Sequence, residues 1–233
     1  MLKYLAIVLT TVVVSLYYFP FEFSFFPGIN TKMMLAVMGV GIAAYRLIQK
    51  RAPGIPDGVF RIVILSLAVS LVGLFSVVMN NTPDYAYATY FVSMTVWLSG
   101  AFTVCTLIKT VHGRLTVERI SIYLVIVCAF QCIMSLVMDS NAEVKAFIDR
   151  YVMQDQELLT DLDRLYGIGA WLDVAGVRFS AALIMLVYVV SKHKASMSNF
   201  RIFMGVSVYL LIAVVGNMIA RTAIVGVGLS IAY

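Results

Sequence analysis

The stretch VFRIVILSLAVSLVGLFSVVM, residues 59–79, contains a single charged side chain, Arg61, close to its beginning. An α-helix needs about 20 consecutive apolar residues to cross the hydrocarbon core of a bilayer. The stretch has that length and that composition, so it predicts a transmembrane helix. Because similar runs recur along the chain, the fold question becomes how many of them cross the membrane and in which direction.

The overall composition agrees with a polytopic membrane protein. The chain has 233 residues, of which 62% are hydrophobic and 12% charged, whereas a soluble domain has about half and about a quarter. A β-barrel would show short alternating segments instead of long apolar runs. The net charge of +5 comes from basic residues in short loops, which favours a membrane-orientation signal over a nucleic-acid partner.

We expect an all-α transmembrane bundle of about seven spans and part of an eighth, forming a single membrane domain over residues 1–233. The expected spans cover residues 4–19, 31–48, 59–79, 86–108, 117–138, 174–191 and 199–219, with an apolar tail over 222–233. The aromatic run from Tyr17 to Phe26 follows the first span and is typical of an interfacial belt. The three cysteines, Cys105, Cys128 and Cys132, fall inside spans, where small buried apolar residues are expected rather than a disulfide or metal site.

The distribution of charge gives an orientation. With the amino terminus inside, 11 of the 17 Lys and Arg residues fall on the cytoplasmic face and ten of the twelve acidic residues fall outside, as the positive-inside rule requires. The longest loop, residues 139–173, is then external. It contains two sets of apolar residues at helical spacing, which predict one or two amphipathic surface helices. The sets are Val144, Phe147, Ile148 and Tyr151, and Leu158, Leu162, Leu165 and Tyr166.

Two arginines are the main candidates for a site. Arg221 lies 22 residues after Asn199, about 33 Å along a helix, so we expect it at the outer boundary of the bilayer. Arg178 is expected at the outer end of the sixth span. A guanidinium is well suited to binding a phosphate or diphosphate, although either arginine could simply reach towards lipid headgroups. Gln131, a polar residue inside the fifth span, could bond to a neighbouring helix or contact a substrate.

Four segments resemble the O-antigen ligase and O-antigen polymerase family of bacterial envelope enzymes. They are GNMIARTAIVGVG (216–228), AGVRFSA (175–181), TPDYAYATYFVSM (82–94) and the pair Gln131–Cys132. The resemblance implies a glycosyltransferase of the GT-C type, at the periplasmic face of the bacterial inner membrane. It also implies that Arg178 and Arg221 hold the diphosphate of an undecaprenyl-diphosphate-linked glycan. The acceptor would be lipid A–core for a ligase or a second carrier-linked glycan for a polymerase, with no metal or nucleotide sugar required.

Members of that family are usually much longer and carry a periplasmic histidine proposed as the base. Both histidines here, His112 and His193, fall in loops expected to be cytoplasmic and solvated. We therefore expect this chain to be the N-terminal half of the family fold, able to bind the carrier but not to turn it over. Two alternatives stay open, namely a fragment of a transporter or flippase for lipid-linked sugars, and a non-catalytic scaffold. Transporters normally place charged groups near the bilayer midplane, where this sequence has no acidic residue.

Overall fold

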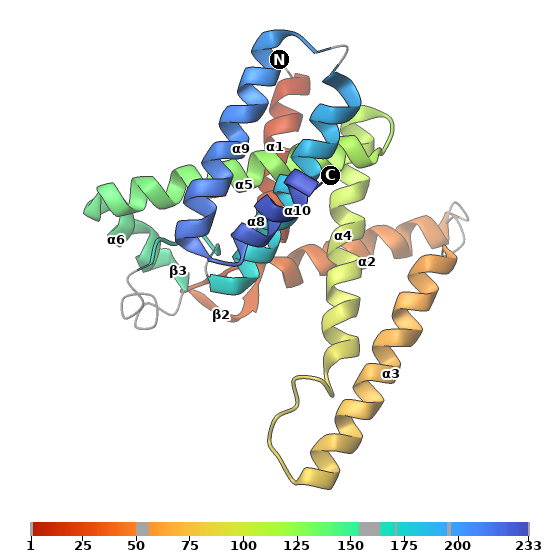
Figure 1. Cartoon of the computed structure of the whole chain (residues 1–233). Helices are drawn as coiled ribbons and strands as arrows, with labels where there is room; N and C mark the ends of the chain where they lie inside the picture. Colours follow the sequence, from red (N-terminus) through yellow and green to blue (C-terminus); the bar gives the residue numbers. More distant parts are fainter. Residues whose placement is uncertain (1, 50–55, 154–163, 171, 195–196, 233) are drawn as a thin grey trace. The chain divides into compact units, whose positions relative to one another are not determined.

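The computed structural model describes residues 2–49, 56–153, 164–170, 172–194 and 197–232 (Figure 1). Within these ranges, six helices are long and apolar enough to cross a membrane. They are α2 (Thr31–Ile48), α3 (Asp57–Asn80), α4 (Tyr90–His112), α5 (Val117–Ser140), α8 (Leu172–His193) and α9 (Asn199–Ile219). The predicted all-α, multi-pass helical architecture is therefore confirmed.

Two shorter apolar helices stand at the two ends of the described chain. Helix α1 (Leu2–Tyr18) has 17 residues, so it is about 25 Å long, at the lower limit for crossing a bilayer. Helix α10 (Ala223–Ala232) has ten residues and corresponds to the partial eighth span. The expected first span is thus helical, but it is shorter than the six helices above.

The largest boundary differences are at the two ends of α4, which runs from Tyr90 to His112 rather than over residues 86–108. Asp84 explains the later start, because its Oδ1 accepts a hydrogen bond of 3.0 Å from the backbone N–H of Ala86. Such a bond from an Asp side chain to the backbone two residues later stabilises a turn in competition with a helix.

The chain divides into two compact units, residues 32–103 and residues 1–31 together with 104–233. Close backbone packing holds the smaller unit together. Ser70 of α3 accepts a hydrogen bond of 2.7 Å from the N–H of Phe91. A Cβ added to Gly73 would lie 2.6 Å from the backbone carbon of Tyr87, so only glycine fits at this position of α3. The larger unit contains all three candidate site residues.

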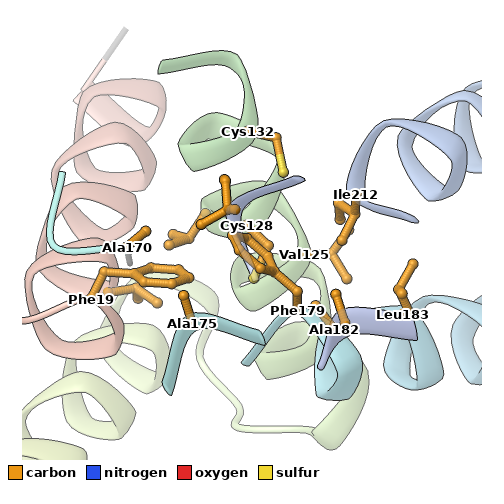
Figure 2. Packing of buried hydrophobic residues seen from close by; sticks show 14 of the residues in the cluster. Phe19, Val125, Cys128, Cys132, Ala170, Ala175, Phe179, Ala182, Leu183 and Ile212 are labelled. Carbon is orange, nitrogen blue, oxygen red and sulfur yellow. The ribbon is translucent and has the colours of Figure 1, made fainter. Parts of the chain in front are cut away.

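Helix α5 lies at the centre of the larger unit. Its residues Cys128 and Cys132 are fully buried, and they pack in one cluster with Phe19, Phe179 and Ile212 (Figure 2). These side chains come from α5, from the residue after α1, and from α8 and α9. All three cysteines are free, and the two on α5 act as small apolar core residues, as expected.

Helix α10 packs closely on α8 through small residues. The hydroxyl of Ser180 donates 2.9 Å to the carbonyl of Thr222 and accepts 3.2 Å from the N–H of Gly226. Gly176, one turn before Ser180, lies against the side chain of Thr222. Small residues allow helices in a membrane to approach closely, and polar side chains then bond across the contact.

A small cap, defined as β1 (Glu22–Phe23), β2 (Phe26–Asn30), β3 (Val152–Met153) and α6 (Ala142–Tyr151), adjoins the end of α5. The strands form an antiparallel sheet of order β2-β1-β3. Its core joins Met138, Ile148, Val152 and Tyr166. The hydroxyl of Tyr166 donates 2.8 Å to Asp149. Burial, and then this carboxylate, raise the pKa of Tyr166 above its usual value, which keeps the phenol a donor.

The cap corrects two expectations about aromatic and amphipathic segments. Phe19 was expected in an interfacial belt, but it is fully buried in the core because its ring packs 5.7 Å from that of Phe179. The expected helix near residue 148 is present as α6, yet only Val144 and Ile148 face the cap core. Of the second expected helix, Leu158 and Leu162 lie outside the described residues, and Leu165 and Tyr166 are not helical.

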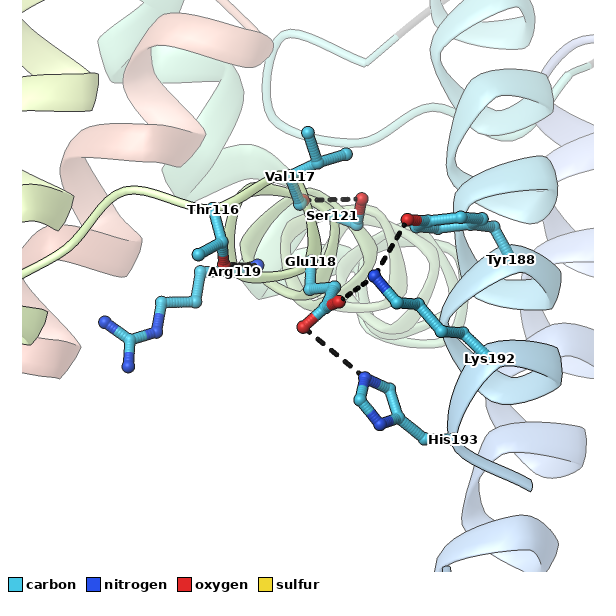
Figure 3. Close-up of polar contacts among 8 residues, drawn as sticks. All are labelled: Thr116, Val117, Glu118, Arg119, Ser121, Tyr188, Lys192 and His193. Atoms are coloured by element: carbon cyan, nitrogen blue, oxygen red, sulfur yellow. Dashed lines mark hydrogen bonds and ion pairs between the residues drawn. The ribbon is translucent and has the colours of Figure 1, made fainter. Parts of the chain in front are cut away.

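Charged contacts gather at the opposite end of the larger unit, where α5 begins and α8 ends. Glu118 forms an ion pair with Lys192, and its second oxygen lies 3.4 Å from Nε2 of His193 (Figure 3). Lys192 also donates 3.3 Å to the hydroxyl of Tyr188. Because these side chains are partly exposed, we assign them a modest role in stability. These contacts join the first turn of α5 to the last turn of α8 and so identify one end of the α5–α8 pair.

Candidate functional site

Arg178 lies in the second turn of α8, beside the end of α1. Its guanidinium carbon is 5.7 Å from the ring centroid of Tyr18 and 5.4 Å from that of Phe19. The hydroxyl of Tyr18 also donates 3.3 Å to the backbone carbonyl of Arg178. Guanidinium groups stack favourably on aromatic faces. The first turns of α8 are thereby fixed against the end of α1, with the arginine half-buried between them.

Arg221 lies in the turn between α9 and α10 and is exposed. Its backbone carbonyl accepts 3.2 Å from the N–H of Ile224, which closes the first turn of α10. The turn contacts α8 directly, because a Cβ added to Gly176 would lie 3.0 Å from the Cβ of Ala220. The structure therefore brings the segments that carry both arginines together, at the end of the unit opposite Glu118.

The two arginine side chains leave this contact in different directions. Gly176 and Ser180 form the α8 face that packs on the turn. Arg178 is two residues from each of them, which is about 200° around a helix. Arg178 therefore projects from the side of α8 that faces away from the α9–α10 turn, towards Tyr18. Arg221 is exposed on the turn itself, on the opposite side of α8. A shared ligand would have to extend across the end of α8.

Gln131 is 1% exposed and links three segments. Its Nε2 donates 3.5 Å to the hydroxyl of Ser15 in α1, and its Oε1 accepts 2.9 Å from the N–H of Ile168. The bond to a neighbouring helix that the sequence predicted is thus present. Residues 164–170 enter the buried part of the unit without forming a helix, so their backbone N–H groups need other acceptors. The bond from Ile168 to Gln131 provides one, as a low-dielectric environment requires.

Replacing Gln131 with leucine should destabilise the unit and loosen residues 164–170. The N–H of Ile168 would lose its acceptor, and an unsatisfied buried donor costs about 1–3 kcal/mol. Unfolding by SDS in mixed micelles, together with amide hydrogen exchange at residue 168, would measure both effects. Ser15→Ala is the control, because it removes only the longer 3.5 Å bond. Unchanged exchange in Gln131→Leu would show that the amide does not hold this segment.

Both histidines lie at the end of the unit opposite Arg178. His112 is the last residue of α4, and its Nε2 is 2.9 Å from the hydroxyl of Tyr123. His193 ends α8 beside Glu118. They are therefore engaged with protein groups rather than simply solvated. Within the described ranges, no group of three or more His, Cys, Asp or Glu residues could hold a metal ion.

Sequence reasoning missed the partners of Arg178, which are Tyr18 and Phe19. The signal was present as the YYF run that ends α1, but such a run is also typical of a membrane interface. Only the packing of α1 against α8 distinguishes the two interpretations. Searches of protein-family models, curated proteins and solved structures find no match to this chain.

Proposed function

We propose that this chain takes part in glycan transfer from an undecaprenyl-diphosphate carrier at the periplasmic face of a bacterial inner membrane, with O-antigen ligase-like or polymerase-like chemistry. The amino terminus would be cytoplasmic. The main supporting observation is the contact of Gly176 with Ala220 and Thr222. This contact joins the segments that contain Arg178 and Arg221, so both arginines lie at one end of the larger unit. Glu118 and the histidines lie at the other end, which agrees with the charge distribution along the sequence.

The chemistry needs positive charge where a diphosphate leaves. As the bond between the sugar and the carrier breaks, negative charge develops on the departing diphosphate, and preorganised cations stabilise it. Exposed Arg221 would supply a bidentate contact at the membrane surface. Arg178, which projects from the side of α8 that faces away from the α9–α10 turn, would supply the second cation to a ligand that extends across the end of α8. The rings of Tyr18 and Phe19 hold its guanidinium in a fixed position.

Replacing Arg221 with alanine should weaken binding of undecaprenyl diphosphate to the full chain in lipid nanodiscs. A hydrogen bond to a charged group contributes about 1.5–3 kcal/mol, so affinity should fall roughly tenfold or more. Arg221→Lys should retain part of the affinity, because lysine keeps the charge but not the planar fork. Titration calorimetry with the diphosphate, the monophosphate and the free alcohol would measure the dependence on phosphate number.

Arg201→Ala is the matched control, since Arg201 is an exposed arginine in the first turn of the same helix, α9, at its opposite end. It should bind the diphosphate as the unchanged chain does. Equal losses of diphosphate affinity in both variants would mean that any exposed positive charge has the same effect. Unchanged affinity in Arg221→Ala would contradict the proposed site. Movement of the labelled carrier across proteoliposomes, without transfer of its glycan, would favour a transporter instead.

A further inference from the structure

The cap exposes aromatic side chains that its own core does not use. Phe25 is 70% exposed, Phe147 65% and Tyr151 42%. The rings of Phe147 and Tyr151 lie 5.1 Å apart, and those of Phe23 and Phe25 5.0 Å apart. The N–H of Ser24 donates 2.9 Å to the carbonyl of Tyr151, so the two pairs adjoin. We call Phe23, Phe25, Phe147 and Tyr151 the aromatic edge.

The apolar face of α6 is only partly covered by the cap. Val144 and Ile148 pack into the cap core. Phe147 is one residue from Ile148, which is about 100° around the helix, and it points away from that core with Tyr151 one turn further on. A solvent-exposed helix of a soluble protein would carry polar residues at these positions. The uncovered part of the apolar face is therefore better suited to an apolar environment than to water.

The connections of the cap indicate what that environment is. Strand β2 ends at Asn30, and α2, which is long and apolar enough to span a membrane, begins at the next residue. Helix α6 follows α5, another such helix, with Asn141 serving as the C-cap of one and the N-cap of the other. Both halves of the aromatic edge thus lie within a few residues of the ends of helices that are long and apolar enough to span a membrane.

We propose that the aromatic edge inserts into the headgroup–acyl boundary of the bilayer that the spans cross. Aromatic side chains are enriched at this depth, and helices with an exposed apolar face lie in it. The charges of α6 balance, because Lys145 and Arg150 offset Glu143 and Asp149. The attraction is therefore apolar, and a zwitterionic membrane is sufficient. The cap then rests on the lipid surface, independently of any glycan or carrier.

Single-tryptophan variants of the full chain in phosphatidylcholine proteoliposomes would test this contact. Trp97 and Trp171 are first replaced by phenylalanine, and Phe147→Trp or Phe25→Trp supplies the reporter. Brominated lipids should quench each reporter by more than half, with blue-shifted emission, and aqueous iodide should have little effect. Ala142→Trp is the matched control, because Ala142 is an exposed residue of α6 about 140° around the helix from Phe147. Its emission should be quenched by iodide and not by the lipids.

Three results would overturn the proposal. Water-like emission of both reporters in pure lipid would place the aromatic edge in solvent. Quenching of Ala142→Trp by brominated lipid would mean that α6 is submerged without a preferred face. Protection of the reporters in native membranes but not in pure lipid would assign the edge to a protein partner. Two reporters on different elements keep the test valid if one substitution prevents folding.

Discussion

Replacing Gly226 with alanine should destabilise the packing of α10 on α8, whereas the same change at Gly228 should stabilise the protein. A Cβ at Gly226 would overlap the Cα of Ser180 and lie 2.9 Å from its carbonyl oxygen. Backbone atoms cannot rotate away, so the helices must separate. Overpacking of this kind costs about 1–3 kcal/mol, and separation also weakens the hydrogen bonds of Ser180 to Thr222 and Gly226.

Gly228 is a matched control in the same helix. A Cβ there meets nothing within 4 Å, so the substitution adds helix propensity alone, worth roughly 0.5–1 kcal/mol. SDS unfolding midpoints should therefore move in opposite directions, and hydrogen exchange of α10 should accelerate only in Gly226→Ala. Equal shifts for the two variants would mean that α10 does not approach α8 as closely as described.

Introduced into a complete transferase of which this chain would form the N-terminal half, Arg178→Ala should remove most of the proposed surface glycan transfer in cells. Removing one preorganised donor from a transition-state site costs about a hundredfold to a thousandfold in rate. Arg178→Lys should recover only part of the activity, because lysine keeps the charge but loses the planar guanidinium that lies over Tyr18 and Phe19. Labelled glycan in the outer envelope, compared at equal protein level, gives the measurement.

The stability of the same variants separates a chemical role from a structural one. If Arg178 mainly fastens α8 to α1, Arg178→Ala should lower the SDS unfolding midpoint and reduce protein level along with transfer. If it also holds the diphosphate, transfer compared at equal protein level should fall in addition to any fall in the midpoint. Normal glycan in Arg178→Ala cells would contradict the proposed role outright, and Arg201→Ala should behave as the unchanged protein in every measurement.

The spanning helices were predictable because their signal is local. A continuous apolar run such as residues 59–79 identifies its helix without knowledge of its neighbours, and α3 covers that run. The sheet of the cap was not predicted, since β1 and β3 have only two residues each and show no periodic pattern, and Glu22 pairs with Met153, which lies far along the chain. Phe19 was misplaced for the same reason, because sequence alone does not show which element packs on an aromatic residue.

The sequence predicted at which end of the spanning helices the two candidate arginines lie, but not the directions in which their side chains point. Counting residues along α9 and reading loop charges put Arg178 and Arg221 at one end of the spans, and the contact of Gly176 with Thr222 agrees. The opposite directions of their side chains depend on which α8 face packs on α10. That face is set by Gly176 and Ser180. The sequence shows that these two residues are small, but it does not show that α10 packs on them.

The pairing of β1 with β3 has a consequence for biosynthesis. Phe23 is partnered by Val152, which the ribosome adds 129 residues later (152 − 23). At a synthesis rate of about 5–20 residues per second, the hairpin of the nascent chain waits roughly 6 to 26 s with one strand edge open. Throughout that interval the open edge can pair with other extended chains. In cell-free synthesis, a released product that ends before residue 152 should therefore aggregate more than a released product that continues past residue 153.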